Sequence, residues 1–235
     1  MKKIYIIKAG TTFDNIVEKY GDFEHWILKY IDDFSTQIID IQQNEQLPKF
    51  ENCAGVIITG SHAMVTQELP WSLKIEAFIK ELLKHKIPLL GICYGHQLIA
   101  KSLGAEVNYH PKGMELGTVN ISLSQEAQND EIFKHLPQTF DVHVVHSQSA
   151  LTLPLNAIVL ASNEFEKNHA FKIEPNIWAV QFHPEYDENI MKAYISEVAK
   201  SKNINEDEIL AKVKDTNYSN KIIKLFADFV KNKQS

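Results

Sequence analysis

The stretch Pro88-Leu-Leu-Gly-Ile-Cys-Tyr-Gly-His-Gln97 places a cysteine between two glycines, directly after an apolar run and directly before a helical pattern. The run from Pro88 to Ile92 predicts a buried strand, and the pattern from Gly95 to Leu103 predicts a helix. The segment Gly91-Ile-Cys-Tyr-Gly95 has the G-x-nucleophile-x-G form, in which flanking glycines let the chain turn sharply from a strand into a helix. The stretch therefore indicates an α/β fold with Cys93 exposed above the sheet.

Short apolar runs alternate with amphipathic segments over the first hundred residues, which is typical of strand-helix-strand units around a parallel sheet. The segment from about Pro70 to Lys84 predicts a covering helix, with a proline suited to its first turn. After Gly104 strands follow without long helices, so we expect an open, mostly parallel sheet with antiparallel additions, flanked by helices. The predicted strands span 4–7, 38–41, 55–59, 88–92, 118–123, 140–146, 157–162, 170–173 and 177–182.

The tail from about residue 188 reads as helical. No repeat, low-complexity tract or Gly/Ser linker marks a boundary. We therefore expect a single domain over 1–235, with a core over about 1–187 and a helical extension over about 188–235. The sequence leaves open whether the extension packs on its own sheet or covers a partner. Its apolar faces comprise Ile190, Tyr194 and Val198, and then Ile222, Ile223, Phe226 and Val230.

Composition excludes several classes of function. The 235 residues carry a formal net charge of -6, and the lysines are scattered among acids, so we expect no nucleic-acid binding. No segment approaches the roughly 20 apolar residues of a membrane-spanning helix, and we expect a cytoplasmic protein without membrane contact. No Cys/His spacing predicts a zinc site, and we expect neither a metal nor a cofactor.

The position of Cys93 favours a chemical role. The helix that follows supplies unpaired N–H groups and the positive end of its dipole, both of which favour a thiolate. The alternative is a small buried hydrophobe, a common role of free cysteine. We assign Cys53, which precedes a strand without such a turn, to packing.

A nucleophilic cysteine needs a base that another group orients. Gln181-Phe-His-Pro-Glu185 stands at the end of the last predicted strand. The two-residue spacing sends His183 and Glu185 to the same side, so the carboxylate can hold one ring nitrogen and leave the other for the sulfur. Carboxyl ends of parallel strands meet at one edge of a sheet, where Cys93 and His183 could come together. Without this context, His-Pro-Glu is usually a turn.

Acyl transfer also needs N–H donors for an oxyanion. Ile58-Thr-Gly-Ser-His62 follows another apolar strand, and Gly60 allows N–H groups to point toward a neighbouring strand end. By itself this segment would be an ordinary turn. His62 is either a residue of the substrate rim or simply exposed.

Together these three stretches resemble the class I glutamine amidotransferases, which use a Cys-His-Glu triad. The resemblance extends from residue 1 to about 187. Lys112-Gly-Met-Glu-Leu-Gly117 and the tail around Val213-Lys-Asp-Thr216 look most like stand-alone domains related to the glutaminase part of GMP synthase.

The resemblance implies that Cys93 attacks the side-chain amide of glutamine and forms a γ-glutamyl thioester, with His183 as acid and then base and Glu185 as its orienting group. It implies that the backbone N–H groups of Gly60 and Tyr94 form the oxyanion site. By the same resemblance the substrate-binding residues are Ser61, Gln97, His146, Ser147 and Gln148. Many relatives have an acidic residue where Gln148 stands, so a charge for the substrate amine is missing.

The ammonia acceptor is not encoded in any recognisable motif, because the chain has no synthetase segment and no nucleotide signature. The first hypothesis is a glutaminase that delivers ammonia to a synthetase partner. The second is a γ-glutamyl peptidase acting on γ-glutamyl conjugates. The third is a catalytically silent binding module on the same fold, against which the intact triad argues.

Overall fold

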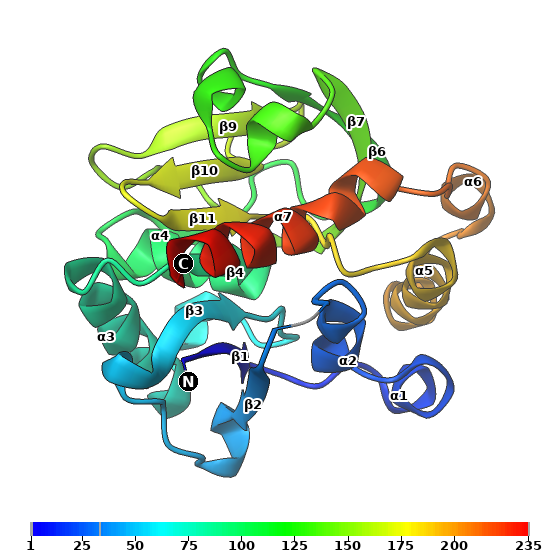
Figure 1. The fold of residues 1–235 in the computed structure, drawn as a ribbon. Helices are drawn as coiled ribbons and strands as arrows, with labels where there is room; N and C mark the ends of the chain where they lie inside the picture. The colour runs from blue at the N-terminus through cyan, green and yellow to red at the C-terminus, as the bar shows by residue number, and fades with distance from the viewer. Residues whose placement is uncertain (1, 33, 235) are drawn as a thin grey trace.

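A mixed sheet forms the centre of the molecule. The computed structural model describes residues 2–32 and 34–234. Within them, nine strands follow the order β2-β1-β3-β4-β11-β10-β9-β6-β7, and a separate pair joins β5 to β8 (Figure 1). The strands are β1 (Lys3–Lys8), β2 (Thr36–Asp40), β3 (Cys53–Ile58), β4 (Leu89–Ile92), β5 (Val107–Tyr109), β6 (Glu115–Leu123), β7 (Thr139–His146), β8 (Gln148–Ala150), β9 (Ile158–Ser162), β10 (Ala170–Ile173) and β11 (Ile177–Val180).

Helices lie on both sides of this sheet and at one end of it. They are α1 (Asp14–Tyr20), α2 (Phe23–Leu28), α3 (Pro70–Lys84), α4 (Tyr94–Ser102), α5 (Glu188–Lys202), α6 (Asp207–Leu210) and α7 (Asn217–Gln234). The bounds of α3 agree with those predicted from its apolar periodicity. Not predicted were α1, α2, β5 and β8, each of at most seven residues, because segments this short carry little periodic signal.

The direction of β11 decides which side chains meet. β2, β1, β3, β4 and β11 are parallel, whereas β10, β9, β6 and β7 join as antiparallel neighbours. The mostly parallel α/β fold class is therefore confirmed. Ile92 of β4 is paired with Val180 of β11, so both strands end at the same edge, directly before Cys93 and Gln181.

The two faces of the sheet bury different residues of the same strands. In β1, Ile4 and Ile6 face the cluster that includes α7, whereas Tyr5 and Ile7 face the cluster of α3 and α4. This alternation of period two produces a continuous apolar run when helices cover both faces.

Of the helical extension, α7 packs on the chain's own sheet, which is one of the two arrangements that the sequence left open. Figure 1 shows α7 lying across one face of the sheet. A Cβ on Gly55 of β3 would lie 2.8 Å from Val230 Cγ2 of α7, so glycine permits this close approach. Among the described residues no helix combines the length and apolarity needed to cross a membrane.

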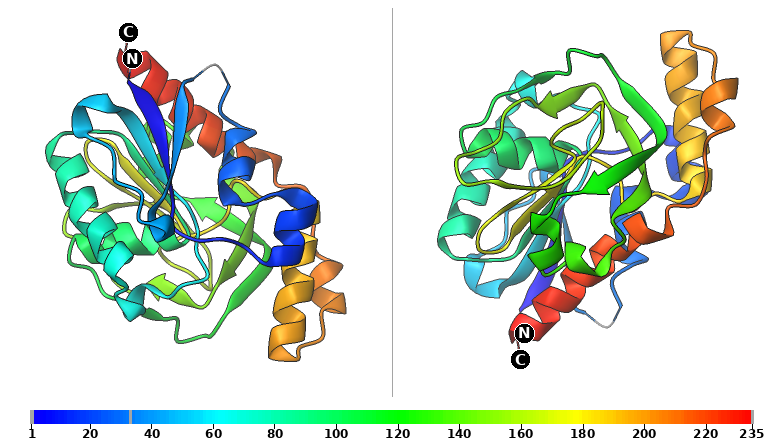
Figure 2. Two further views of the ribbon diagram at one scale, coloured as in Figure 1. Left: turned by 90° about the horizontal axis from the view of Figure 1, so that it is seen from below. Right: turned by 90° about the horizontal axis from the view of Figure 1, so that it is seen from above.

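A third apolar cluster closes the carboxyl edge of the parallel strands. It joins α1 and α2 to α5 through residues such as Trp26, Tyr186 and Tyr194. Both views of Figure 2 show α1 beside α5 at one end of the molecule, away from α3. The helices α1, α2 and α5 therefore form a wall at the sheet edge where β4 and β11 end.

Candidate active site

Cys93 occupies a strained corner between β4 and α4. Its backbone has φ 50° and ψ -95°, a conformation that costs a non-glycine residue on the order of 1–3 kcal/mol. A Cβ on Gly95 would lie 2.7 Å from the carbonyl oxygen of Ile58, and one on Gly91 would lie 2.6 Å from that of Gly95. Both glycines are therefore needed for the close approach of α4 to the sheet.

Cys93 is 6% exposed, so it is more enclosed than the expected nucleophile above the sheet. The surrounding loops cover it, and it is reached through a cavity. Its Sγ lies 3.9 Å from the carbonyl oxygen of Val145, and Gln181 Nε2 lies 3.6 Å from Sγ. Cys53 is also a free, buried cysteine, with Sγ 3.4 Å from the carbonyl oxygen of Lys49.

His183 and Glu185 form a buried pair beside this corner. His183 Nδ1 lies 2.7 Å from Glu185 Oε1, and the two side chains are 2% and 0% exposed. Within the described residues, His183 Nε2 has no hydrogen-bond partner, so this nitrogen is free to exchange a proton. The local spacing of two residues produces the contact that the sequence predicted.

The surroundings of His183 favour its protonated form. Burial alone would lower its pKa, but the interactions of His183 with Glu185 and with the Cys93 sulfur outweigh this effect and raise the pKa to about 10. The His183 ring is stacked on the ring of Tyr186 with centroids 4.1 Å apart. The ring of Phe23 is nearly parallel to it, with centroids 6.3 Å apart. Packing between these rings restricts the imidazole to one orientation.

Of the two predicted oxyanion donors, Tyr94 lines the cavity and Gly60 lies beside His183. A Cβ on Gly60 would lie 3.0 Å from Cε1 of His183, so glycine keeps this approach open. Thr59 Oγ1 donates to the carbonyl oxygen of Gly60 at 2.9 Å, which holds the Gly60–Ser61 peptide. Tyr94 is the first residue of α4, where backbone N–H groups have no intrahelical acceptor.

Three predicted substrate-binding residues are occupied by contacts within the protein. Gln97 Nε2 donates to the carbonyl oxygen of Gln148 at 2.7 Å and to Gln181 Oε1 at 3.1 Å. Gln148 Nε2 donates to Thr66 Oγ1 at 2.7 Å. His146 lies 3.0 Å from Glu115 through Nε2. All three also line the cavity, as do Ser61 and Ser147, so their roles toward substrate stay predictions.

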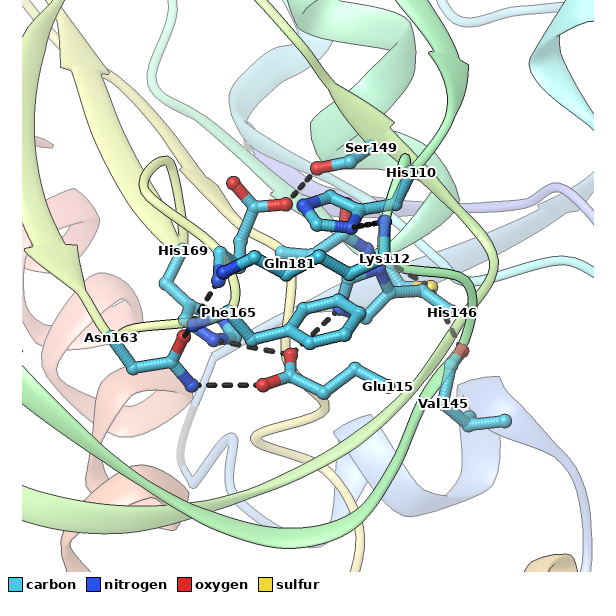
Figure 3. Close-up of polar contacts among 12 residues, drawn as sticks. His110, Lys112, Glu115, Val145, His146, Ser149, Asn163, Phe165, His169 and Gln181 are labelled. Carbon is cyan, nitrogen blue, oxygen red and sulfur yellow. Dashed lines mark hydrogen bonds and ion pairs between the residues drawn. The ribbon is translucent and has the colours of Figure 1, made fainter.

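Glu115 is the centre of a buried polar cluster behind the site, shown in Figure 3. Its carboxylate accepts from Asn163 Nδ2 at 2.8 Å and lies 3.3 Å from His169 Nε2, in addition to the contact with His146. Burial would raise the pKa of Glu115, but the hydrogen bonds from His146 and Asn163 and the nearby ring of His169 hold it well below its usual range. The cluster holds the end of β7 in place. Residues 146–148, which lie at and directly after this end, line the cavity.

The cavity in front of Cys93 has a volume of about 310 Å³. It extends from Cys93 and His183 past His62 to the end of α5. His62 is exposed and its Nε2 lies 3.2 Å from the hydroxyl of Tyr194, which places it at the rim. In the described part of the chain, no three His, Cys, Asp or Glu side chains are grouped to hold a metal ion.

Two residues with direct contacts in the site received no role from the sequence. Gln181 belongs to the quoted motif, and its amide donates toward the sulfur of Cys93. Asn220 of α7 donates through Nδ2 to the carbonyl oxygens of Pro184, at 2.7 Å, and Tyr186, at 3.0 Å. No local pattern could have revealed Asn220, because the contact spans more than 30 residues of sequence.

Comparisons with known proteins show the family to which the chain belongs. Residues 15–199 match the family described as Glutamine amidotransferase class-I. The chain is 30% identical over 216 residues to gamma-glutamyl peptidase 4 of Arabidopsis thaliana, covering 88% of this chain and 85% of that protein. It is 35% identical over 174 residues to a glutamine-hydrolyzing GMP synthase subunit of Pyrococcus abyssi, covering 72% of this chain and 87% of that one.

The fold is shared with a solved structure as well. A glutamine amidotransferase from Thermotoga maritima superimposes with a TM-score of 0.74 at 21% identity, covering 99% of this chain and 98% of that one. The matched family segment contains both the Cys93 corner and the His183–Glu185 pair. The chain therefore belongs to the class I glutamine amidotransferase family.

Proposed function

We propose that the protein hydrolyses γ-glutamyl amide bonds, with Cys93 as nucleophile, His183 as acid and base, and Glu185 as the group that orients His183. One observation carries the proposal. Cys93 and His183 line the same cavity from the ends of adjacent parallel strands, and Nδ1 of the His183 ring is bound by the buried carboxylate of Glu185.

In the first half of the reaction the Cys93 sulfur attacks the γ-carbonyl carbon of the substrate. The carbonyl oxygen becomes an oxyanion facing the N–H groups of Gly60 and Tyr94, and each such donor is worth roughly 3 kcal/mol of the barrier. The C–N bond then breaks, and the leaving nitrogen takes a proton from His183. A γ-glutamyl thioester and a free amine, or ammonia, result.

In the second half a water molecule attacks the thioester carbonyl while His183 accepts a proton from it. The C–S bond breaks, glutamate leaves, and Cys93 and His183 return to their starting states. Glu185 keeps the imidazole in one orientation through both proton transfers.

The relatives support two substrate classes for this chemistry. The relative named as a glutamine-hydrolyzing GMP synthase subunit favours glutamine as substrate and a synthetase partner that receives the ammonia. The relative named gamma-glutamyl peptidase favours γ-glutamyl conjugates, which need no partner. The cavity of about 310 Å³, which continues well beyond Cys93, favours the second class.

The test is release of glutamate by the purified protein from glutamine and from a panel of γ-glutamyl peptides. The chain offers a matched control, because Cys53 and Cys93 are both buried, free thiols. We expect Cys93→Ala to abolish release and Cys53→Ala to retain it. Turnover by Cys93→Ala would refute the assignment of the nucleophile.

The same measurement separates the two substrate classes. Fast release from peptides without release from glutamine identifies a hydrolase of γ-glutamyl conjugates. Release from glutamine alone identifies an amidotransferase, and its rate should then rise when its synthetase partner is added. No release from any compound in the panel would favour a binding module.

A further inference from the structure

The cavity has an outer half that the proposed chemistry at Cys93 does not use. Its far end is formed by Val198, Ser201 and Lys202, which follow Tyr194 on one face of α5. Lys202 lies eight positions after Tyr194, which corresponds to about 12 Å along a helix. The cavity therefore continues beyond the space that one glutamine side chain would occupy.

The walls of this outer half are apolar. Phe13, Met64 and Met114 line it from three separate segments, and Val198 lines it from α5. These side chains are only partly buried, apart from Val198 at 5% exposure. Apolar walls of this kind favour extended, partly apolar ligands because burial removes apolar surface from water.

Lys202 is the one lysine of α5 whose charge is not balanced within the described part of the chain. Lys200 forms an ion pair with Glu197 at 2.8 Å, and Lys192 pairs with Glu188. Lys202 is exposed and, among the described residues, makes no ion pair.

The residues that line the cavity offer Lys202 no acidic partner either. Of the described residues that line the cavity, none is Asp or Glu, and Lys202 is the only lysine. A ligand that reaches this end would meet an uncompensated positive charge beside apolar walls.

We propose that this outer half, which we call the leaving-group subsite (Phe13, Met64, Met114, Val198 and Lys202), binds the peptide portion of γ-glutamyl peptides, with Lys202 contacting its terminal carboxylate. The inference rests on the proposed γ-glutamyl hydrolysis. An extended two-residue leaving group spans about 7 Å. The flexible four-carbon stem of lysine covers the remaining distance. The preferred substrate class is therefore a γ-glutamyl group linked to a short peptide with a free carboxylate.

The experiment compares γ-glutamyl-alanyl-glycine with the same compound carrying a C-terminal amide. We expect the wild type to have the higher kcat/KM for the free acid. Lys202→Met should reduce the acid-to-amide ratio by about three- to fivefold, the range of a partly exposed ion pair. Lys202→Glu should reduce it further, and 1 M salt should reduce it in the wild type because it screens the charge.

Lys200→Met is the matched control, since it removes a lysine from the same helix that already has a partner. The ratio should not change in this variant. An unchanged ratio in both Lys202 variants, with activity on both compounds, would overturn the subsite and leave the hydrolysis intact. Absence of release from both compounds and from glutamine in the wild type would instead refute the hydrolytic function itself.

Discussion

Glu185 Oε1 lies 2.7 Å from His183 Nδ1, and this contact holds the imidazole by one of its two ring nitrogens. The two residues leave β11 at the edge where β4 also ends, so the pair faces Cys93 without a long connecting loop. A carboxylate in this position orients the ring and stabilises its positive charge, as in the general arrangement of nucleophile, base and orienting acid.

Replacing Glu185 with glutamine tests this relationship. Glu185→Gln keeps the size of the side chain but removes the charge that raises the pKa of His183. We expect kcat for glutamate release to fall by about 100- to 10,000-fold, the scale seen when an orienting carboxylate is lost. Steady-state kinetics, with circular dichroism to confirm folding, measures the effect. A loss below about threefold would contradict the role of Glu185.

Gln181 offers a test of how the sulfur is held. Its Nε2 donates toward Cys93 Sγ at 3.6 Å, and a donor at this position favours a negatively charged sulfur. We expect Gln181→Leu to slow alkylation of Cys93 by iodoacetamide at pH 7 by about tenfold, the lower end for a hydrogen bond to a charged group. Gln181→Glu should slow it more, because it adds a carboxylate beside the sulfur. Equal alkylation rates in all three proteins would rule out this contribution.

Asn220 links the C-terminal extension to the site. Its amide donates to the carbonyl oxygens on both sides of Glu185, those of Pro184 and Tyr186. Asn220→Ala leaves both oxygens without this donor, so we expect a loss of about 1–3 kcal/mol in the free energy of unfolding. We also expect a lower kcat with little change in KM, because Glu185 loses its support.

Asn217→Ala is the control for this prediction, since Asn217 is exposed at the start of the same helix. Its stability and kcat should stay close to those of the wild type. If Asn220→Ala lost stability but kept the wild-type kcat, the extension would only stabilise the fold.

Two buried histidines predict sensitivity to acid. Burial lowers the pKa of His96 to about 3, with help from the nearby histidines His146 and His169. Burial and the charge of His183 lower the pKa of His143 to about 4. In the unfolded chain both would titrate near pH 6.5. As the pH falls below about 6.5, the unfolded state takes up protons that the folded state does not bind, so stability decreases.

Urea unfolding between pH 4 and pH 8 measures this effect. Each such histidine contributes a slope of up to about 1.4 kcal/mol per pH unit over its window. We expect His143→Gln to flatten the dependence between about pH 6.5 and pH 4. An identical slope in wild type and variant would show that His143 does not cause the pH dependence of stability. His183 acts in the opposite direction: its raised pKa stabilises the fold fully below pH 6.5, and this contribution is lost as the pH rises through about 10.

The sequence by itself determined the elements whose signals are local. The glycines around Cys93 specify the turn because only residues without Cβ allow α4 to approach β3 and β4 so closely. The spacing of His183 and Glu185 determines their contact because residues two apart near a strand end point the same way. The mostly parallel sheet follows from apolar runs that alternate with amphipathic helices.

Only the tertiary structure decided how distant segments complete the site. The parallel pairing of β11 with β4 brings His183 to Cys93 across 90 residues. Asn220 reaches the loop around Glu185 because α7 packs on the sheet through Val230, and Lys202 reaches the cavity because α5 packs beside α1. Such contacts depend on which apolar faces are buried against one another, a property of the whole packed chain that no local pattern contains.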